Sequence, residues 1–139
     1  MIQAMMKQML GTIQSDVSAE QVTAAVNGYL DSWRNGDAQA RVALFADNAV
    51  IEDPVGAAAV EGKAALLEFW QRAAVVPTVF EPTLERLVVC GNEALVAFSL
   101  RVSVTGMPGC TIQILENFKL DKQGKIRSLR AFWDENSVS

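Results

Sequence analysis

The second half of the chain alternates apolar and polar residues over several long segments, and this alternation constrains the fold more than any other feature. It is clearest over residues 94–104, where every second side chain is apolar. These apolar side chains are Ala94, Val96, Phe98, Leu100, Val102 and Val104. Because successive side chains of a strand point to opposite faces, the pattern predicts a strand with one buried face. Further strands are predicted over 79–90, 110–120 and 125–133, and the turn-forming residues between them favour an antiparallel meander.

The first half has helical spacing instead. A capping box at Ser18-Ala19-Glu20-Gln21 predicts the start of a helix, and Asn35-Gly36 predicts its end. Asp37 is expected to cap a short second helix that carries Phe45. A third helix is expected after Glu61-Gly62.

A short strand is predicted between the second and third helices. Asp47-Asn48 predicts a turn, and the mostly apolar residues 49–53 predict the strand that follows it. Pro54 should end this strand, because proline lacks the backbone N–H that a sheet requires.

This order of elements predicts an α+β roll. A strongly curved antiparallel sheet would wrap around three helices and enclose an apolar cavity. We expect residues 18–139 to form one domain and residues 1–17 to be an N-terminal extension. The extension has the spacing of a short amphipathic helix, which either packs on the domain or on a partner chain, or is a frayed leader. Apolar and small residues on the second face of strand 94–104 favour a homodimer.

The sequence contains no histidine, and this excludes catalytic triads with an imidazole base and metal sites with imidazole ligands. Acid–base chemistry near pH 7 must then use other groups with shifted pKa values. Cys90 and Cys110 do not make a zinc site, and we expect both to be reduced. We expect no metal and no cofactor.

Charge and hydropathy limit the possible partners. The net charge is −4 and no cluster of Lys or Arg is present, so nothing indicates nucleic-acid binding. No apolar run is long enough to span a bilayer, and the N-terminus does not resemble a signal peptide. We therefore expect a cytoplasmic protein that does not contact membranes.

Three ionisable residues interrupt apolar faces of the predicted elements. Asp53 shares a strand face with Ala49 and Ile51, and Tyr29 lies on the apolar stripe of the first long helix. Glu116 is the one polar residue in the row formed by Ile112, Ile114, Glu116, Phe118 and Leu120. Burial raises the pKa of a carboxyl group, so Glu116 is expected to stay protonated. Tyr29 and Glu116 can then stabilise an oxyanion while an ionised Asp53 removes a proton.

Each of these residues also has a purely structural interpretation. Asp53 can hydrogen-bond the backbone of its own turn. Tyr29 can belong to the core, with its hydroxyl on a buried partner. Glu116 can lie near the edge of the sheet and reach water. The coincidence of the three favours a site for proton transfer next to a carbonyl group.

The chain resembles the ketosteroid isomerases of the NTF2-like/SnoaL-like group over roughly residues 20–136. The segment 44–49, followed by Glu52-Asp53-Pro54-Val55-Gly56, is similar to the family's pattern around its catalytic base. Ala131-Phe132-Trp133, followed by Glu135-Asn136, is similar to its last strand. The resemblance implies an NTF2-like/cystatin-like roll. It also implies isomerisation of a Δ5-3-ketosteroid, in which a proton moves from C4 to C6 through a dienolate.

The resemblance also implies roles for individual residues. Asp53 matches the base, Tyr29 the oxyanion-hole tyrosine, and Glu116 the protonated oxyanion-hole aspartic acid. Trp133 falls where some members place an indole beside the base. We expect further contacts with the substrate, a small apolar ketone such as a steroid, from aromatic residues. These are Phe45, Phe69, Trp70, Phe98 and Phe118.

The sequence departs from the family's pattern in two respects. Glu116 has one methylene more than the usual aspartic acid, which moves its carboxyl group by on the order of 1 Å. Phe45 and Trp70 stand where some relatives have tyrosines that hydrogen-bond the oxyanion-hole tyrosine. These differences imply a slower isomerase, or a pocket suited to a different ketone.

Two other functions remain open. The first is another enzyme on the same fold, such as an epoxide hydrolase or a polyketide cyclase. A hydrolase of this type is expected to use an Asp-Arg-Asp set around a water, and Arg101 lies on the opposite face of its strand from the apolar row. The second is a non-catalytic binding module for apolar small molecules, because one fold hosts many functions.

Overall fold

The computed structural model describes all 139 residues, which form four α-helices, two short 3-10 helices and six strands. In chain order these are α1 (Ile2–Met9), η1 (Leu10–Thr12), α2 (Ala19–Arg34), α3 (Ala38–Val42), β1 (Phe45–Glu52), β2 (Val60–Glu61), α4 (Lys63–Ala73), β3 (Thr78–Cys90), β4 (Glu93–Val104), β5 (Cys110–Leu120), β6 (Ile126–Phe132) and η2 (Glu135–Ser137). The predicted α+β class and the four-stranded meander are both present.

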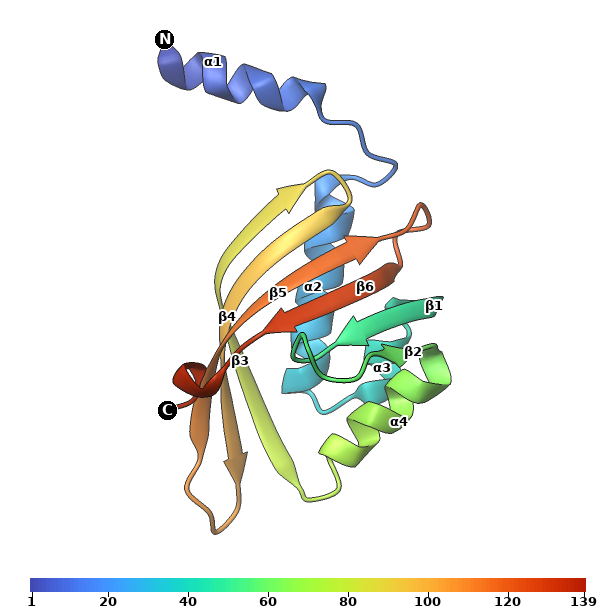
Figure 1. The fold of residues 1–139 in the computed structure, drawn as a ribbon, viewed down its shortest axis with the longest axis vertical. Coiled ribbons are helices and arrows are strands. Elements are labelled where there is room, and N and C mark those ends of the chain that lie inside the picture. Colours follow the sequence, from blue (N-terminus) through green and yellow to red (C-terminus); the bar gives the residue numbers. More distant parts are fainter.

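All six strands belong to one sheet, in the order β2-β1-β6-β5-β4-β3. The pairs β3–β4, β4–β5 and β5–β6 are antiparallel, as the alternation predicts. The long strands curve, and α2 lies against their concave side (Figure 1). The core lies between this concave side and the helices, so the inward rows of β4 and β5 face α2.

The structure differs from the prediction around β1. Phe45 begins this strand and does not belong to the second helix, and Asp47 and Asn48 lie within the strand and not in a turn. β1 pairs with β6 in parallel, with a register shift between Phe45 and Val50. The sheet is therefore mixed and not wholly antiparallel. Pairing between segments so far apart in the chain leaves no local pattern. The short elements β2 and η2 were also missed, because two or three residues are too few to show a period.

The start of α2 follows the sequence closely. Ser18 Oγ accepts a hydrogen bond from the backbone N–H of Gln21 at 3.1 Å, and Gln21 Oε1 accepts one from the backbone N–H of Ser18 at 2.8 Å. This is the predicted capping box, and it satisfies two of the free N–H groups of the first turn. The helix ends before Gly36, whose φ of +63° suits glycine. The capping box and Gly36 thus fix where α2 begins and ends.

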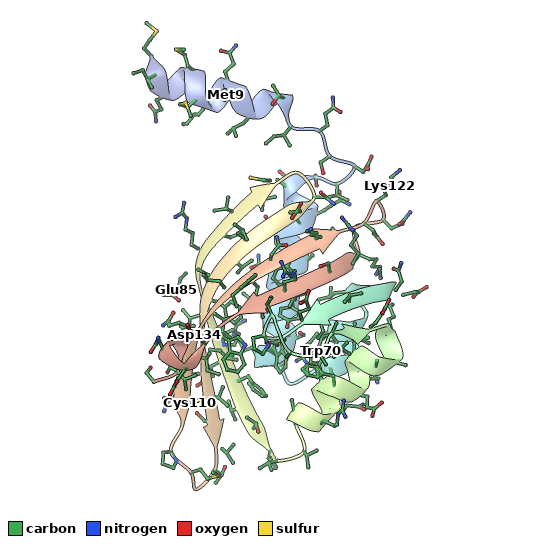
Figure 2. All side chains as sticks on the ribbon, viewed as in Figure 1. Met9, Trp70, Glu85, Cys110, Lys122 and Asp134 are labelled. Carbon is green, nitrogen blue, oxygen red and sulfur yellow. The ribbon has the colours of Figure 1, made fainter.

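The N-terminal extension has no buried side chain in α1 or η1. Figures 1 and 2 show α1, with Met9 near its end, standing away from the rest of the molecule. No helix is both long and apolar enough to cross a membrane. Cys90 and Cys110 are both free thiols.

Candidate active site

A cavity of about 350 Å³ lies between the concave face of β3–β5 and helix α2. Its walls are mostly apolar and come from three adjacent strands, the end of α2 and the segments after β1 and β6. Asp53, Tyr29 and Glu116 all line it. An apolar cavity with a few convergent polar groups is the usual form of a small-molecule site. The three residues that the sequence singled out therefore line one cavity.

Tyr29 is positioned by aromatic packing. It lies on the inward face of α2 and is only 3% exposed. Its ring makes edge-to-face contacts with Phe118 at 5.3 Å, Phe45 at 6.1 Å and Trp33 at 6.3 Å between centroids. Burial raises the pKa of the Tyr29 phenol well above its ordinary value, and the carboxyl groups of Glu116 and Asp53 raise it further. Tyr29 is therefore a neutral hydrogen-bond donor in this cavity.

Glu116 lies in the middle of β5, between Val96 of β4 and Ala131 of β6. It is 2% exposed, so it does not reach water at the edge of the sheet. Its Oε1 atom is buried and has no hydrogen-bond partner in the protein. Burial raises the pKa of Glu116 well above its ordinary value, and the charge of Asp53 raises it further. Both effects favour the protonated carboxyl group, which can donate a hydrogen bond to a ligand.

Asp53 follows directly after β1 and is held by a contact from the far end of the chain. Trp133 Nε1 donates a hydrogen bond of 2.9 Å to Asp53 Oδ1. The backbone N–H of Val55 donates to the carbonyl oxygen of Ala131 at 2.8 Å, which ties the turn after Asp53 to β6. The carboxylate bonds Trp133 and not the backbone of its own turn, unlike the structural alternative considered for it. Burial raises the pKa of Asp53, while the Trp133 hydrogen bond lowers it.

The aromatic residues predicted to contact substrate fall into two groups. Trp133 and Phe98 line the cavity. Phe45 and Phe118 lie behind Tyr29, and Phe45 in turn contacts Trp70 at 5.2 Å between centroids. Trp70 is on the inward face of α4 and is 2% exposed (Figure 2).

Phe69 is half-buried and packs against the core. Phe45, Phe69, Trp70 and Phe118 therefore do not line the cavity. Periodicity marks an inward face but does not separate core positions from cavity positions.

The sequence did not point to two residues of this region as functional. Trp33 lines the cavity one turn after Tyr29. The ring of Phe80 on β3 packs edge to face against the Trp33 ring, with 4.9 Å between centroids. Arg41 of α3 is buried, although a cation on a short helix is normally expected to face solvent. Trp33 comes four residues after Tyr29 and therefore shares its helical face, but no sequence signal indicated the burial of Arg41.

A SnoaL-like domain model matches residues 26–129, which is most of the chain. The chain belongs to the SnoaL-like family. It is 39% identical over 118 residues to the steroid Delta-isomerase of Nocardioides simplex, and the match covers 84% of this chain and 92% of that enzyme. The family resemblance inferred from the motifs is thus confirmed, and so is the prediction that the protein is an isomerase.

Solved structures support the fold of this SnoaL-like protein. The Δ5-3-ketosteroid isomerase from Mycobacterium sp. is similar with a TM-score of 0.76 and 26% identity, over 86% of this chain and 97% of that one. The epoxide hydrolase/cyclase-like enzyme SalBIII, which acts in pyran ring formation, is similar with a TM-score of 0.75 and 30% identity, over 86% and 95% of the two chains. The predicted NTF2-like roll is confirmed, and the fold by itself is compatible with more than one chemistry.

Proposed function

We propose that this protein is a Δ5-3-ketosteroid isomerase, which moves a double bond from Δ5 to Δ4 without a cofactor. The observation that carries the proposal is the convergence of Asp53, Tyr29 and Glu116 on one apolar cavity. The steroid Delta-isomerase relative supports the same reaction. A flat apolar ketone suits the cavity, because its walls are mostly apolar.

Asp53 is the base in the proposed mechanism. Its ionised carboxylate removes a proton from C4 of the ketosteroid, and the electron pair moves into a dienolate with negative charge on the C3 oxygen. The same carboxyl group then returns the proton to C6, which leaves the double bond conjugated with the ketone. The hydrogen bond from Trp133 supports this role, because it favours the ionised form and fixes the position of one oxygen.

Tyr29 and Glu116 stabilise the dienolate oxygen. Both are neutral donors in a dry environment, where a hydrogen bond to a developing negative charge is strongest. The unpartnered Oε1 of Glu116 supports this assignment, because a ligand oxygen would supply the missing partner of that carboxyl group. This division between one ionised carboxylate and two neutral donors is the one known for ketosteroid isomerases.

The test is the ultraviolet absorbance of the conjugated enone formed from 5-androstene-3,17-dione. We expect the wild-type protein to form the enone, and Asp53→Asn to lose about 10²-fold to 10⁴-fold in kcat, the range typical of a general base. Asp47→Asn is the matched control, since Asp47 lies on β1 and its side chain is 99% exposed. An unchanged rate in Asp53→Asn would exclude Asp53 as the base. A flat trace with wild-type protein that still binds the steroid would support a binding module.

A second candidate is epoxide opening, which the similarity to SalBIII favours. An Asp-Arg-Asp set around a water does not form in the cavity, whose lining includes the carboxyl groups of Asp53 and Glu116 but no arginine. Arg101 is exposed, and its guanidinium contacts Thr111 Oγ1 at 3.5 Å. Product analysis with an epoxide substrate separates the two reactions, because a diol or a cyclic ether would replace the enone.

A further inference from the structure

Arg41 is a buried cation without a carboxylate partner. It lies on α3 and is 3% exposed, and none of the three ion pairs in the structure includes it. Its Nε donates to Ser32 Oγ at 3.0 Å and its Nη2 donates to the Ser32 carbonyl oxygen at 3.1 Å. A buried charge is unfavourable unless polar partners or an electrostatic gain compensate for its loss of water. Ser32 supplies the neutral partners.

Two tryptophans supply further stabilisation. The Arg41 guanidinium carbon lies 3.5 Å from the ring centroid of Trp33 and 5.1 Å from that of Trp70. Cations within about 6 Å of an indole face are attracted by the ring quadrupole. The guanidinium charge is thus held between α2, which carries Trp33, and α4, which carries Trp70.

Both contacts of Arg41 on α2 lead to Tyr29. Ser32 Oγ, which accepts from Arg41, donates in turn to the Tyr29 carbonyl oxygen at 2.6 Å. Trp33, on which the guanidinium stacks, contacts the Tyr29 ring edge to face and lines the cavity. Arg41 therefore holds the last turn of α2 in two ways. A hydrogen-bond relay runs from Arg41 through Ser32 to the Tyr29 carbonyl oxygen, and the guanidinium stacks on the ring of Trp33.

We propose that Arg41 is a positioning residue for the isomerase reaction, which fixes Tyr29 through Ser32 and Trp33 and places a positive charge behind the oxyanion site. This inference rests on the role proposed above for Tyr29. As dienolate charge develops, a cation in this low-dielectric layer stabilises it through the phenol.

The charges around the pair are consistent with this role. Tyr29 is faced by the carboxyl groups of Glu116 and Asp53, which raise its pKa, and by Arg41, which lowers it. Arg41 is faced by Tyr29 and by Asp37, which caps α3. Burial lowers the pKa of Arg41 to about 10, so it is cationic at pH 7. Arg41 is then the one group whose charge makes Tyr29 a better donor.

Kinetics at pH 7 provide the first test. We expect Arg41→Met to lower kcat about tenfold with little change in KM, a smaller loss than the removal of a direct oxyanion donor. Arg41→Lys, which keeps the charge, should recover most of the loss. Arg72→Met, which removes an exposed cation from α4, should behave as wild type. Equal losses in Arg41→Met and Arg41→Lys would overturn the electrostatic part of the proposal.

A second test needs no activity. Tyr29 is the only tyrosine, so incorporation of a ring-fluorinated tyrosine labels this position alone. The fluorinated phenol is more acidic, and its fluorine NMR shift reports its titration directly. We expect its pKa to rise in Arg41→Met and to stay near the wild-type value in Arg41→Lys. A titration that Arg41→Met leaves unchanged, in folded protein, would overturn the proposal, whereas a protein without isomerase activity but with the shifted titration would overturn only the proposed reaction.

Discussion

Trp133 and Asp53, which lie 80 positions apart in the chain, are joined by an indole hydrogen bond of 2.9 Å. Trp133 comes directly after β6 and Asp53 directly after β1, and these two strands are parallel neighbours. Parallel pairing brings the ends of both strands to the same edge of the sheet. The contact therefore depends on the one part of the topology that departs from the meander.

The first prediction concerns this hydrogen bond. Trp133→Phe removes a donor that favours the ionised carboxylate, so the pKa of Asp53 should rise. Because the base acts only when ionised, activity should be lost at a higher pH than in wild type as the solution is acidified. The pH dependence of kcat/KM for the enone assay measures this limb. An acid limb at the wild-type position would show that the indole does not tune the base.

The second prediction concerns the phenol. Tyr29→Phe keeps the aromatic contacts with Phe45 and Phe118 but removes the donor. We expect kcat to fall by about 10²-fold to 10³-fold with a small change in KM, because an oxyanion donor acts mainly in the transition state. Steady-state kinetics separate the two parameters. A change in KM alone would assign Tyr29 to substrate binding.

The third prediction concerns stability and pH. The folded pKa of Glu116 lies above its ordinary value of 4.5, so the folded protein retains a proton that the unfolded chain releases as the pH rises past that value. Between pH 4.5 and the folded pKa of Glu116, the contribution of Glu116 to stability should decrease by about 1.4 kcal/mol per pH unit. Glu116→Gln has no such proton.

Urea unfolding of both proteins between pH 4 and pH 8 provides the measurement. The stability of Glu116→Gln relative to wild type should increase with pH above about 4.5, and should be independent of pH below it. Asp53 titrates in both proteins, so the difference isolates Glu116. Parallel stability curves across the whole range would show that the pKa of Glu116 is not raised in the folded protein.

The fourth prediction concerns assembly. The outer face of the sheet exposes a group of large apolar residues, which are Val88, Leu95, Leu115 and Phe132. An exposed apolar face of this kind favours the homodimer expected from the sequence. Leu95→Arg should give a monomer in analytical ultracentrifugation, whereas Val75→Arg, outside this face, should not. A wild-type protein that sediments as a monomer would refute the prediction.

The fifth prediction concerns the N-terminal extension. Because no side chain of α1 or η1 is buried, deletion of residues 2–12 should leave the thermal midpoint and kcat unchanged. Differential scanning calorimetry and the enone assay check this. A lower midpoint, or a change in oligomeric state, would show that the apolar side of α1 packs against the domain or a partner.

The candidate catalytic residues were within reach of the sequence because each interrupts a local period. Glu116 breaks a row with the period of a strand, Tyr29 lies on a stripe with the period of a helix, and Asp53 comes where Pro54 ends a strand. No periodic pattern in the sequence indicated that Arg41 is buried. Its burial depends on Trp33, Trp70 and Ser32, and these come from two other helices.

The amino-acid sequence by itself determined which side chains share a face, because backbone geometry repeats every 3.6 residues in helices and every two in strands. It also determined the ends of α2, where caps act over three or four residues. Only the tertiary structure decided which inward residues line the cavity and which fill the core, and that Trp133 reaches Asp53. Distance, burial and pKa depend on the curvature of the sheet and on segments far apart in the chain, and no local period encodes these.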